Sequence, residues 1–119
     1  MNLVFVYGTL KRGYRNHRWL AGQKFIGEAR TEPGYTLHAL GEYPGMIRST
    51  ADAAGVTGEL WQITPAVLAE LDKLEGLDEG LYQRVAITLA PPFAHESVET
   101  YLYLRSLSGH PAIGPVWRE

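Results

Sequence analysis

Glu75 is the residue whose type and position point most directly to chemistry. It stands near the end of a helix expected over 64–75, and at about 100° per residue it falls in the apolar stripe that contains Leu68 and Leu71. Glutamate is rarely buried unless it is paired. Desolvation and the helix macrodipole both favour the protonated form of a carboxyl group in this position. Such a group exchanges protons near neutral pH, as general acid–base catalysis requires.

The end of the helix allows a second interpretation of Glu75. Gly76 follows directly and is a natural helix stop, so a helix that frays one turn early would turn the carboxylate to water. Periodicity alone leaves both interpretations open. Asp72 lies at the edge of the apolar stripe, and we expect it to be an exposed or capping carboxylate.

A second candidate site is the turn that follows the first apolar run. Residues 3–7 are rich in β-branched and aromatic side chains and predict a buried strand, which Gly8 breaks. A strand that ends in a Gly-Thr turn presents free backbone N–H groups, and concave arrays of such groups bind anions. An ordinary tight turn between two elements is the alternative.

The elements that must position these residues follow from apolar runs separated by glycine and proline. Thr64 as N-cap and Pro65 as the first helical residue predict the start of the one clear helix. Further strands are expected at 23–29, 35–40, 56–63, 82–89 and 97–104. The connecting segments are one or two helical turns at 14–20, turns or loops at 41–45, 49–55 and 91–96, and an irregular tail at 108–119.

About six short strands and one clear helix predict an α+β fold. We expect a small mixed β-barrel or a strongly curled sheet with flanking helices, because the strand–helix alternation of a doubly wound sheet is missing. A chain of 119 residues that is 45% hydrophobic suits one domain over 1–119. The sequence has no cysteine, which excludes disulfides and thiolate chemistry. With no apolar segment long enough for a membrane span or signal peptide, the expected location is the cytoplasm.

Other kinds of site find little support. Net charge is −2, so nucleic-acid binding would depend on the basic run 11–18, which lacks interleaved aromatic residues across a strand face. The four histidines are scattered singly, and neither a metal nor a cofactor is expected. The segment 8–11 lacks the spacing of a phosphate-binding P-loop, and no Gly-x-Ser-x-Gly elbow occurs.

Two motifs nevertheless occur together, Tyr7-Gly8-Thr9-Leu10 after the first strand and Leu-Asp-Lys-Leu-Glu-Gly at 71–76, followed by Tyr-Gln-Arg at 82–84. This combination resembles the γ-glutamylcyclotransferase-like family, in particular its short γ-glutamylamine cyclotransferase branch and the bacterial relatives of that branch. The resemblance covers nearly the whole chain and extends to 56–61 and 101–103.

The resemblance implies a small β-barrel with flanking helices and an enzyme that releases 5-oxoproline from a γ-glutamyl amine or amide. The α-amine of the substrate attacks the γ-carbonyl group, so the protein supplies no nucleophile, and Glu75 acts as base and then as acid. The implied substrate-binding residues are Tyr7, Gly8, Thr9, Leu10 and, as a second polar group, Tyr82. We expect Arg84, Trp61 and the turn 43–45 in the wall of the cleft.

Two classes of function remain. The first is this cyclotransferase, and the second is a non-catalytic module that binds γ-glutamyl compounds or other small acidic metabolites. A carboxylate on a buried face favours the enzyme, because a protein that only binds an α-carboxylate gains nothing from Glu75. The segments 41–55 and 91–96 carry no charge pattern that selects lysine, a peptide or an aminoglycoside as the leaving amine, and no oligomeric state follows from the sequence.

Overall fold

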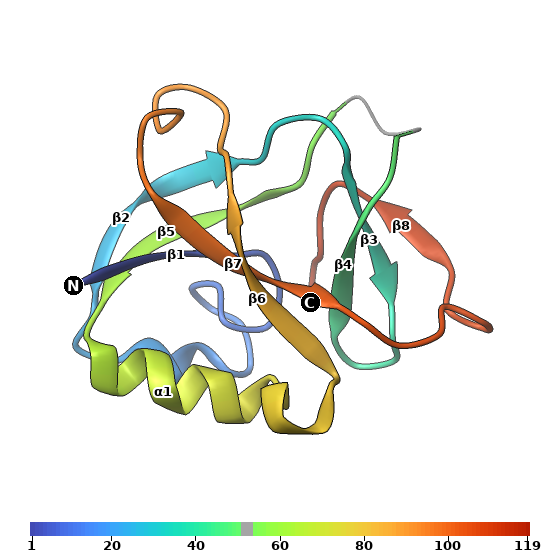
Figure 1. Cartoon of the computed structure of the whole chain (residues 1–119), viewed down its shortest axis with the longest axis horizontal. Helices are drawn as coiled ribbons and strands as arrows, with labels where there is room; N and C mark the ends of the chain where they lie inside the picture. The colour runs from blue at the N-terminus through green and yellow to red at the C-terminus, as the bar shows by residue number, and fades with distance from the viewer. Residues whose placement is uncertain (51–53) are drawn as a thin grey trace.

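The computed structural model describes residues 1–50 and 54–119, and this part of the chain forms two β-sheets, one α-helix and two short 3-10 helices. In Figure 1 the helix lies below the larger sheet, and the smaller sheet lies to the right of the larger one. The elements are β1 (Asn2–Val6), η1 (His17–Leu20), β2 (Lys24–Arg30), β3 (Tyr35–Ala39), β4 (Pro44–Arg48), β5 (Thr57–Ile63), α1 (Pro65–Leu74), η2 (Leu77–Glu79), β6 (Tyr82–Ile87), β7 (Val98–Tyr103) and β8 (Ala112–Gly114).

The first apolar run forms β1, which lies in the middle of the larger sheet. The strand order is β2-β5-β1-β7-β6, and β1 pairs antiparallel with β5 and parallel with β7. Val4 and Val6 pack in one apolar core, whereas Phe5 packs in another. A strand that is buried on both faces reads as a continuous apolar run, and for this reason β1 shows no polar alternation.

The two cores lie on opposite faces of the larger sheet. The first contains Leu68 and Leu71 of α1 and Leu20 of η1, and the second contains Leu37 of β3 and Met46 of β4. In β5 the same division explains why neighbouring residues are apolar on both faces of the strand. Leu60 packs in the second core, while Trp61 and Ile63 pack in the first.

The smaller sheet has the order β4-β3-β8. The described residues confirm the α+β class and the curled mixed sheet. The predicted barrel does not close, because no strand of one sheet pairs with a strand of the other. The smaller sheet packs against β7 and covers one face of the larger sheet instead of continuing it.

Three predicted segments differ from the structure. The tail is not wholly irregular, because Ala112–Gly114 forms β8 beside β3. Pro44 and Gly45, predicted in a turn, begin β4, where edge position makes proline tolerable. The predicted loop 49–55 includes residues 51–53, which lie outside the described residues. No helix in the described ranges has the length and apolar character needed to cross a membrane.

The start of α1 agrees with its sequence signals. The Thr64 hydroxyl oxygen accepts a hydrogen bond from the Val67 N–H at 3.2 Å, and Pro65 is the first helical residue. Gly76 adopts the left-handed conformation, with φ 66° and ψ 40°, so the helix ends as its glycine predicts. The two ends of the helix are thus well defined, and Glu75 lies at its C-terminal end.

We expect Gly58→Ala to destabilise the fold by about 3 kcal/mol, because the added Cβ has no room in β5. It would lie 2.3 Å from the Val6 carbonyl oxygen and 2.7 Å from the Phe5 ring. Urea unfolding would measure the loss. Gly27→Ala is the matched strand control, because its Cβ would lie 3.1 Å from the tip of the Phe93 side chain, which can move. An equal effect in both variants would contradict the close approach.

Candidate active site

A cavity of about 360 Å³ lies where β1 ends, between the end of α1 and the hairpin that joins β3 to β4. It brings together every residue that the sequence suggested for substrate or proton transfer, and also Tyr43 and Pro44 of the expected wall. Its lining residues are Phe5, Val6, Tyr7, Gly8, Thr9, Leu10, Arg15, Asn16, Glu42, Tyr43, Pro44, Leu74, Glu75, Leu81, Tyr82 and Tyr101.

The turn after β1 is held by bonds to its carbonyl groups. The Lys11 N–H donates to the Gly8 oxygen at 3.2 Å, and Asn16 bonds the Thr9 carbonyl through its N–H at 2.9 Å and the Thr9 hydroxyl through Nδ2 at 3.0 Å. In the described part of the chain, the amide groups of Gly8, Thr9 and Leu10 have no acceptor. Three neighbouring N–H groups at a cavity therefore remain free for an anion.

Gly8 is required by close packing at this turn. A Cβ on Gly8 would lie 2.7 Å from Cγ and 2.9 Å from Cδ of Pro44. The proline ring thus covers the turn directly, and only glycine lets β4 approach so closely. Tyr82 secures this contact, because its buried hydroxyl donates to the Pro44 carbonyl oxygen at 2.7 Å.

Glu75 is the C-cap of α1, with φ −82° and ψ 0°, and its N–H donates to the Leu71 oxygen at 2.9 Å. The helix does not fray one turn early, and the side chain is half-buried against the cavity. Desolvation raises the pKa of Glu75 from 4.5 to about 7. Leu74, the residue before Glu75, lines the same cavity and is 37% exposed.

Two tyrosine hydroxyl groups near Glu75 donate their protons to backbone carbonyl groups. Tyr7 donates to the Tyr101 carbonyl oxygen at 2.7 Å and accepts from the Met46 N–H at 3.3 Å. Burial, followed by the nearby Glu75 charge, raises the pKa of Tyr7 well above its usual value. Burial likewise raises the pKa of Tyr82. Both hydroxyls therefore remain protonated wherever Glu75 titrates, and neither competes with it as an acid.

Sequence reasoning missed several lining residues, mainly because they come from separate loops and strands. Arg15 belongs to the basic run and bonds Glu119 through Nε at 3.2 Å and Glu42 through a terminal nitrogen at 3.4 Å. Tyr101 lies in the segment 101–103 to which the family resemblance extends, but neither the resemblance nor the strand pattern gave it a role. The register of β6 and β7, which no local pattern gives, brings Tyr101 to the cavity.

The basic run binds acceptors of its own chain. Lys11 is buried, and its Nζ donates to the Trp117 carbonyl oxygen at 2.8 Å. The Arg12 Nε donates to the buried Glu59 at 3.0 Å. Desolvation lowers the pKa of Lys11. These cations hold the loop after the turn in place, as Arg15 does through Glu119.

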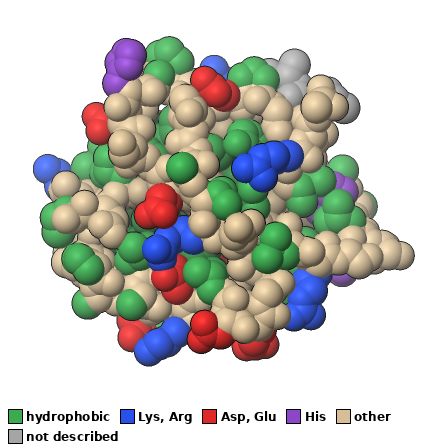
Figure 2. All heavy atoms as spheres, in the orientation of Figure 1, with side chains coloured by type: hydrophobic (Ala, Val, Ile, Leu, Met, Phe, Trp, Pro, Cys, Tyr) green, Lys and Arg blue, Asp and Glu red, His purple; other side chains and the backbone are tan. Residues whose placement is uncertain are grey.

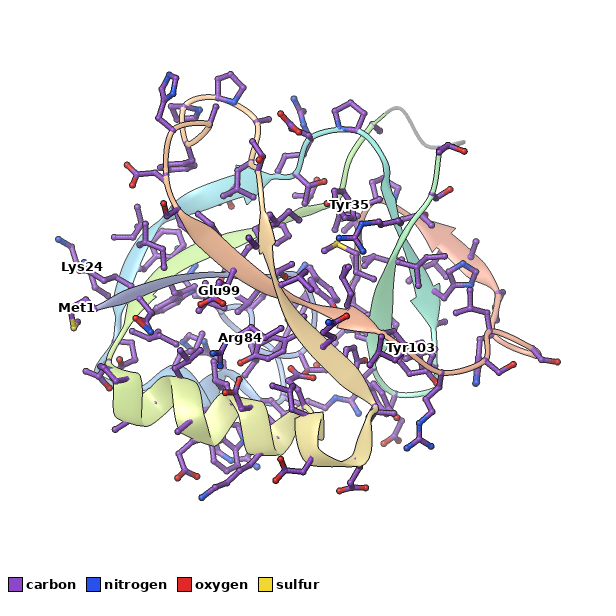
Figure 3. The ribbon with its side chains drawn as sticks, viewed as in Figure 1. Met1, Lys24, Tyr35, Arg84, Glu99 and Tyr103 are labelled. Carbon is purple, nitrogen blue, oxygen red and sulfur yellow. The ribbon has the colours of Figure 1, made fainter. Side chains whose placement is uncertain are left out.

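Two residues expected in the cleft wall lie elsewhere. Trp61 packs in the first core, edge-on to Phe25, and its Nε1 donates to Glu59 at 3.1 Å. Arg84 forms ion pairs with Asp72 and Glu99 outside the cavity. Figure 2 shows a basic side chain between acidic ones on this face, and Figure 3 labels Arg84 beside Glu99. Asp72 is therefore paired, and is neither a cap nor fully exposed.

The described residues contain no group of three or more histidine or carboxylate side chains arranged to hold a metal ion. The cavity is lined both by the turn with free N–H groups and by the desolvated carboxyl group of Glu75. Free backbone N–H groups can bind an anion, and a carboxyl group whose pKa is near neutral can exchange a proton.

Comparison with known proteins identifies the family. Residues 4–117 match the family described as "Gamma-glutamyl cyclotransferase, AIG2-like". The chain therefore belongs to the γ-glutamyl cyclotransferase, AIG2-like family. A Vibrio cholerae protein named "Putative gamma-glutamylcyclotransferase" is 42% identical over 74 residues, a stretch that covers 62% of each chain. The chain thus spans less than two thirds of that relative.

Other relatives match over more of their length. The Escherichia coli K12 protein named "Gamma-glutamylcyclotransferase family protein YtfP" is 34% identical over 106 residues, which cover 89% of this chain and 86% of the relative. The crystal structure of c4763, a protein specific to uropathogenic E. coli, superposes with a TM-score of 0.78 at 30% identity, over 95% of this chain and 87% of that one.

We expect Glu75→Gln to stabilise the protein at alkaline pH. The pKa of Glu75 is higher in the folded state, so its ionisation weakens the fold as pH rises from 4.5 through about 7. The variant removes this loss and should gain about 3 kcal/mol at about pH 8, because each pKa unit corresponds to about 1.4 kcal/mol, and this difference nearly disappears by pH 4.5.

Urea unfolding at a series of pH values would measure this difference. Glu70→Gln is the matched control on the same helix, because Glu70 is exposed and only pairs with Lys73 at 3.6 Å. A gain for Glu75→Gln that does not change with pH would contradict the burial of the carboxylate.

Proposed function

We propose that this protein is a γ-glutamyl cyclotransferase that converts a small γ-glutamyl amine or amide into 5-oxoproline and a free amine. The observation that carries the proposal is the Glu75 carboxyl group, with a pKa of about 7, at the same cavity as the free amides of residues 8–10. The family membership of the chain supports the same reaction.

The reaction needs no nucleophile from the protein. The α-nitrogen of the substrate forms a bond to its own γ-carbonyl carbon, and the bond from that carbon to the leaving nitrogen breaks. The α-ammonium group loses two protons in all and the expelled nitrogen gains two, so the amine leaves as an ammonium ion without net proton uptake. Because the attack is intramolecular, holding the substrate in the folded conformation supplies much of the acceleration.

In this mechanism the turn 7–10 holds the glutamyl group. The free amides of Gly8, Thr9 and Leu10 suit its α-carboxylate, which several N–H groups bind best together. The backbone at Tyr7 continues the same wall. A volume of about 360 Å³ lies within the range of pockets for small ligands.

Glu75 accepts a proton from the α-nitrogen and passes it to the leaving nitrogen. A base that is half ionised near neutral pH is also a good acid there, so one group performs both transfers. Tyr82 contributes as a neighbouring polar group, because its hydroxyl oxygen can accept a hydrogen bond while its proton is held by Pro44.

The alternative function is a module that binds a small acidic metabolite without converting it. The same turn would serve both functions, but only the enzyme uses a carboxyl group that titrates near neutral pH. Release of 5-oxoproline from a panel of γ-glutamyl amines, amides and peptides distinguishes them. Binding of such compounds without any release would favour the module.

We expect Glu75→Gln to lower kcat for 5-oxoproline release at least about 100-fold, because the amide cannot accept and return a proton. The matched control Glu70→Gln, on the solvent face of α1, should retain full activity. Chromatographic assay of 5-oxoproline with both variants tests this prediction. Full activity of Glu75→Gln would contradict the assignment, whatever its effect on stability.

The pH dependence of kcat/KM gives an independent test. The base must be ionised in the free enzyme, so kcat/KM should fall about tenfold per pH unit below the pKa of Glu75, which is about 7. Rates measured from about pH 5 to 9 on one substrate would show this acidic limb. A limb centred near 4.5, the ordinary pKa of glutamate, would contradict the desolvated state.

A further inference from the structure

A polar cluster lies outside the cavity, between the end of α1 and strands β6 and β7. Arg84 and Tyr101 stand opposite each other in the register of β6 and β7. The Arg84 guanidinium forms an ion pair with Asp72 of α1, and its Nε lies 3.2 Å from Glu99. The Tyr101 hydroxyl donates to the other Asp72 oxygen at 2.8 Å.

Tyr101 joins this cluster to the cavity. Its side chain lines the cavity while its hydroxyl is held by Asp72, and its carbonyl oxygen accepts the Tyr7 hydroxyl at 2.7 Å. Asp72 lies on the last turn of α1, and the Leu71 carbonyl next to it accepts the Glu75 N–H at 2.9 Å. Displacement of Asp72 would therefore displace Glu75.

The chemistry of the cluster favours one arrangement of its groups. A planar guanidinium can bond two carboxylates in fixed directions, which an ammonium group cannot reproduce. The side chains of Arg84 and Asp72 are 28% and 26% exposed, so the pair is partly shielded from water. Without Arg84, Asp72 would place an uncompensated negative charge near the C-terminal end of α1, where the helix dipole opposes it.

We propose that Asp72, Arg84 and Tyr101 form a positioning unit that fixes the last turn of α1 against β7 and so holds the Glu75 carboxyl group in the cavity. These three are positioning residues, because they act through Glu75. The proposal rests on the proposed function for its effect on rate, but the placement of Glu75 can be measured without turnover.

Tyr101→Phe is the sharpest test, because it removes one hydroxyl group and keeps the ring. We expect kcat to fall about tenfold with KM within about twofold, since substrate binding depends on the turn 7–10. Tyr103→Phe is the matched control two residues along β7. Its hydroxyl has no hydrogen-bond partner among the described residues, and the residue does not line the cavity.

A titration of the Glu75 side-chain carboxyl carbon by NMR supplies the readout that does not need activity. Loss of the Asp72 bond loosens the helix end and admits water, so the pKa of Glu75 should fall by about half a unit or more in Tyr101→Phe. The acidic limb of kcat/KM should move by the same amount. The titratable and charged groups that face Glu75 are Tyr7, Tyr82 and Tyr101, with Arg15 and Glu42 at the cavity mouth.

Arg84 supplies a second comparison. Arg84→Met should lower kcat as Tyr101→Phe does, and Arg84→Lys should restore only part of it, because a lysine cannot bond Asp72 and Glu99 in the same geometry. If the cluster served stability alone, Tyr101→Phe would change the unfolding free energy and leave the Glu75 titration in the folded protein unchanged.

The outcomes separate the two proposals. An unchanged Glu75 titration and unchanged kcat in Tyr101→Phe would overturn the positioning unit, while turnover by the wild-type protein would still support the cyclotransferase. If the wild-type protein releases no 5-oxoproline, the proposed function fails, and a shifted Glu75 titration in Tyr101→Phe but not in Tyr103→Phe still supports the positioning of the carboxyl group.

Discussion

Burial of β1 on both faces is the constraint on which the rest of the structure depends. The strand separates two apolar cores and pairs with β5 on one side and β7 on the other. This packing and pairing fix the position at which β1 ends. The turn that follows can therefore keep three amide groups free at the cavity, while its own cations bind Glu59, Glu119 and the Trp117 carbonyl. These bonds hold the turn that carries the free N–H groups.

The electrostatics of the cavity also depend on which charged groups are paired with each other. In the loop, Arg12 and Arg15 pair with Glu59 and Glu119. Arg84 pairs with Asp72 and Glu99. Desolvation alone then sets the state of Glu75, whose pKa rises to about 7. Had a guanidinium paired with Glu75, the carboxylate would be held ionised and would make a poor acid. The distribution of ion pairs thus supports a role in proton transfer.

Local patterns predicted much of the framework because they depend on neighbours in the chain. Thr64, Pro65 and Gly76 marked the helix ends, and the apolar run at 3–7 marked the central strand. The wrong expectations concern distant contacts. Trp61 and Arg84 carry side chains suited to a cleft wall, but strand register turns Trp61 into a core and Arg84 toward Asp72.

By itself the sequence determined the order and kind of most elements, the apolar face of α1 with Glu75 in it, and the resemblance that named the reaction class. Only the tertiary structure decided that the sheets do not close into a barrel, that β8 pairs with β3, and that Tyr101 and Pro44 reach the same cavity as Gly8. The reason is physical. Periodicity and capping are fixed by bonds between near neighbours, whereas a cavity and its pKa values depend on which distant surfaces exclude water from one another.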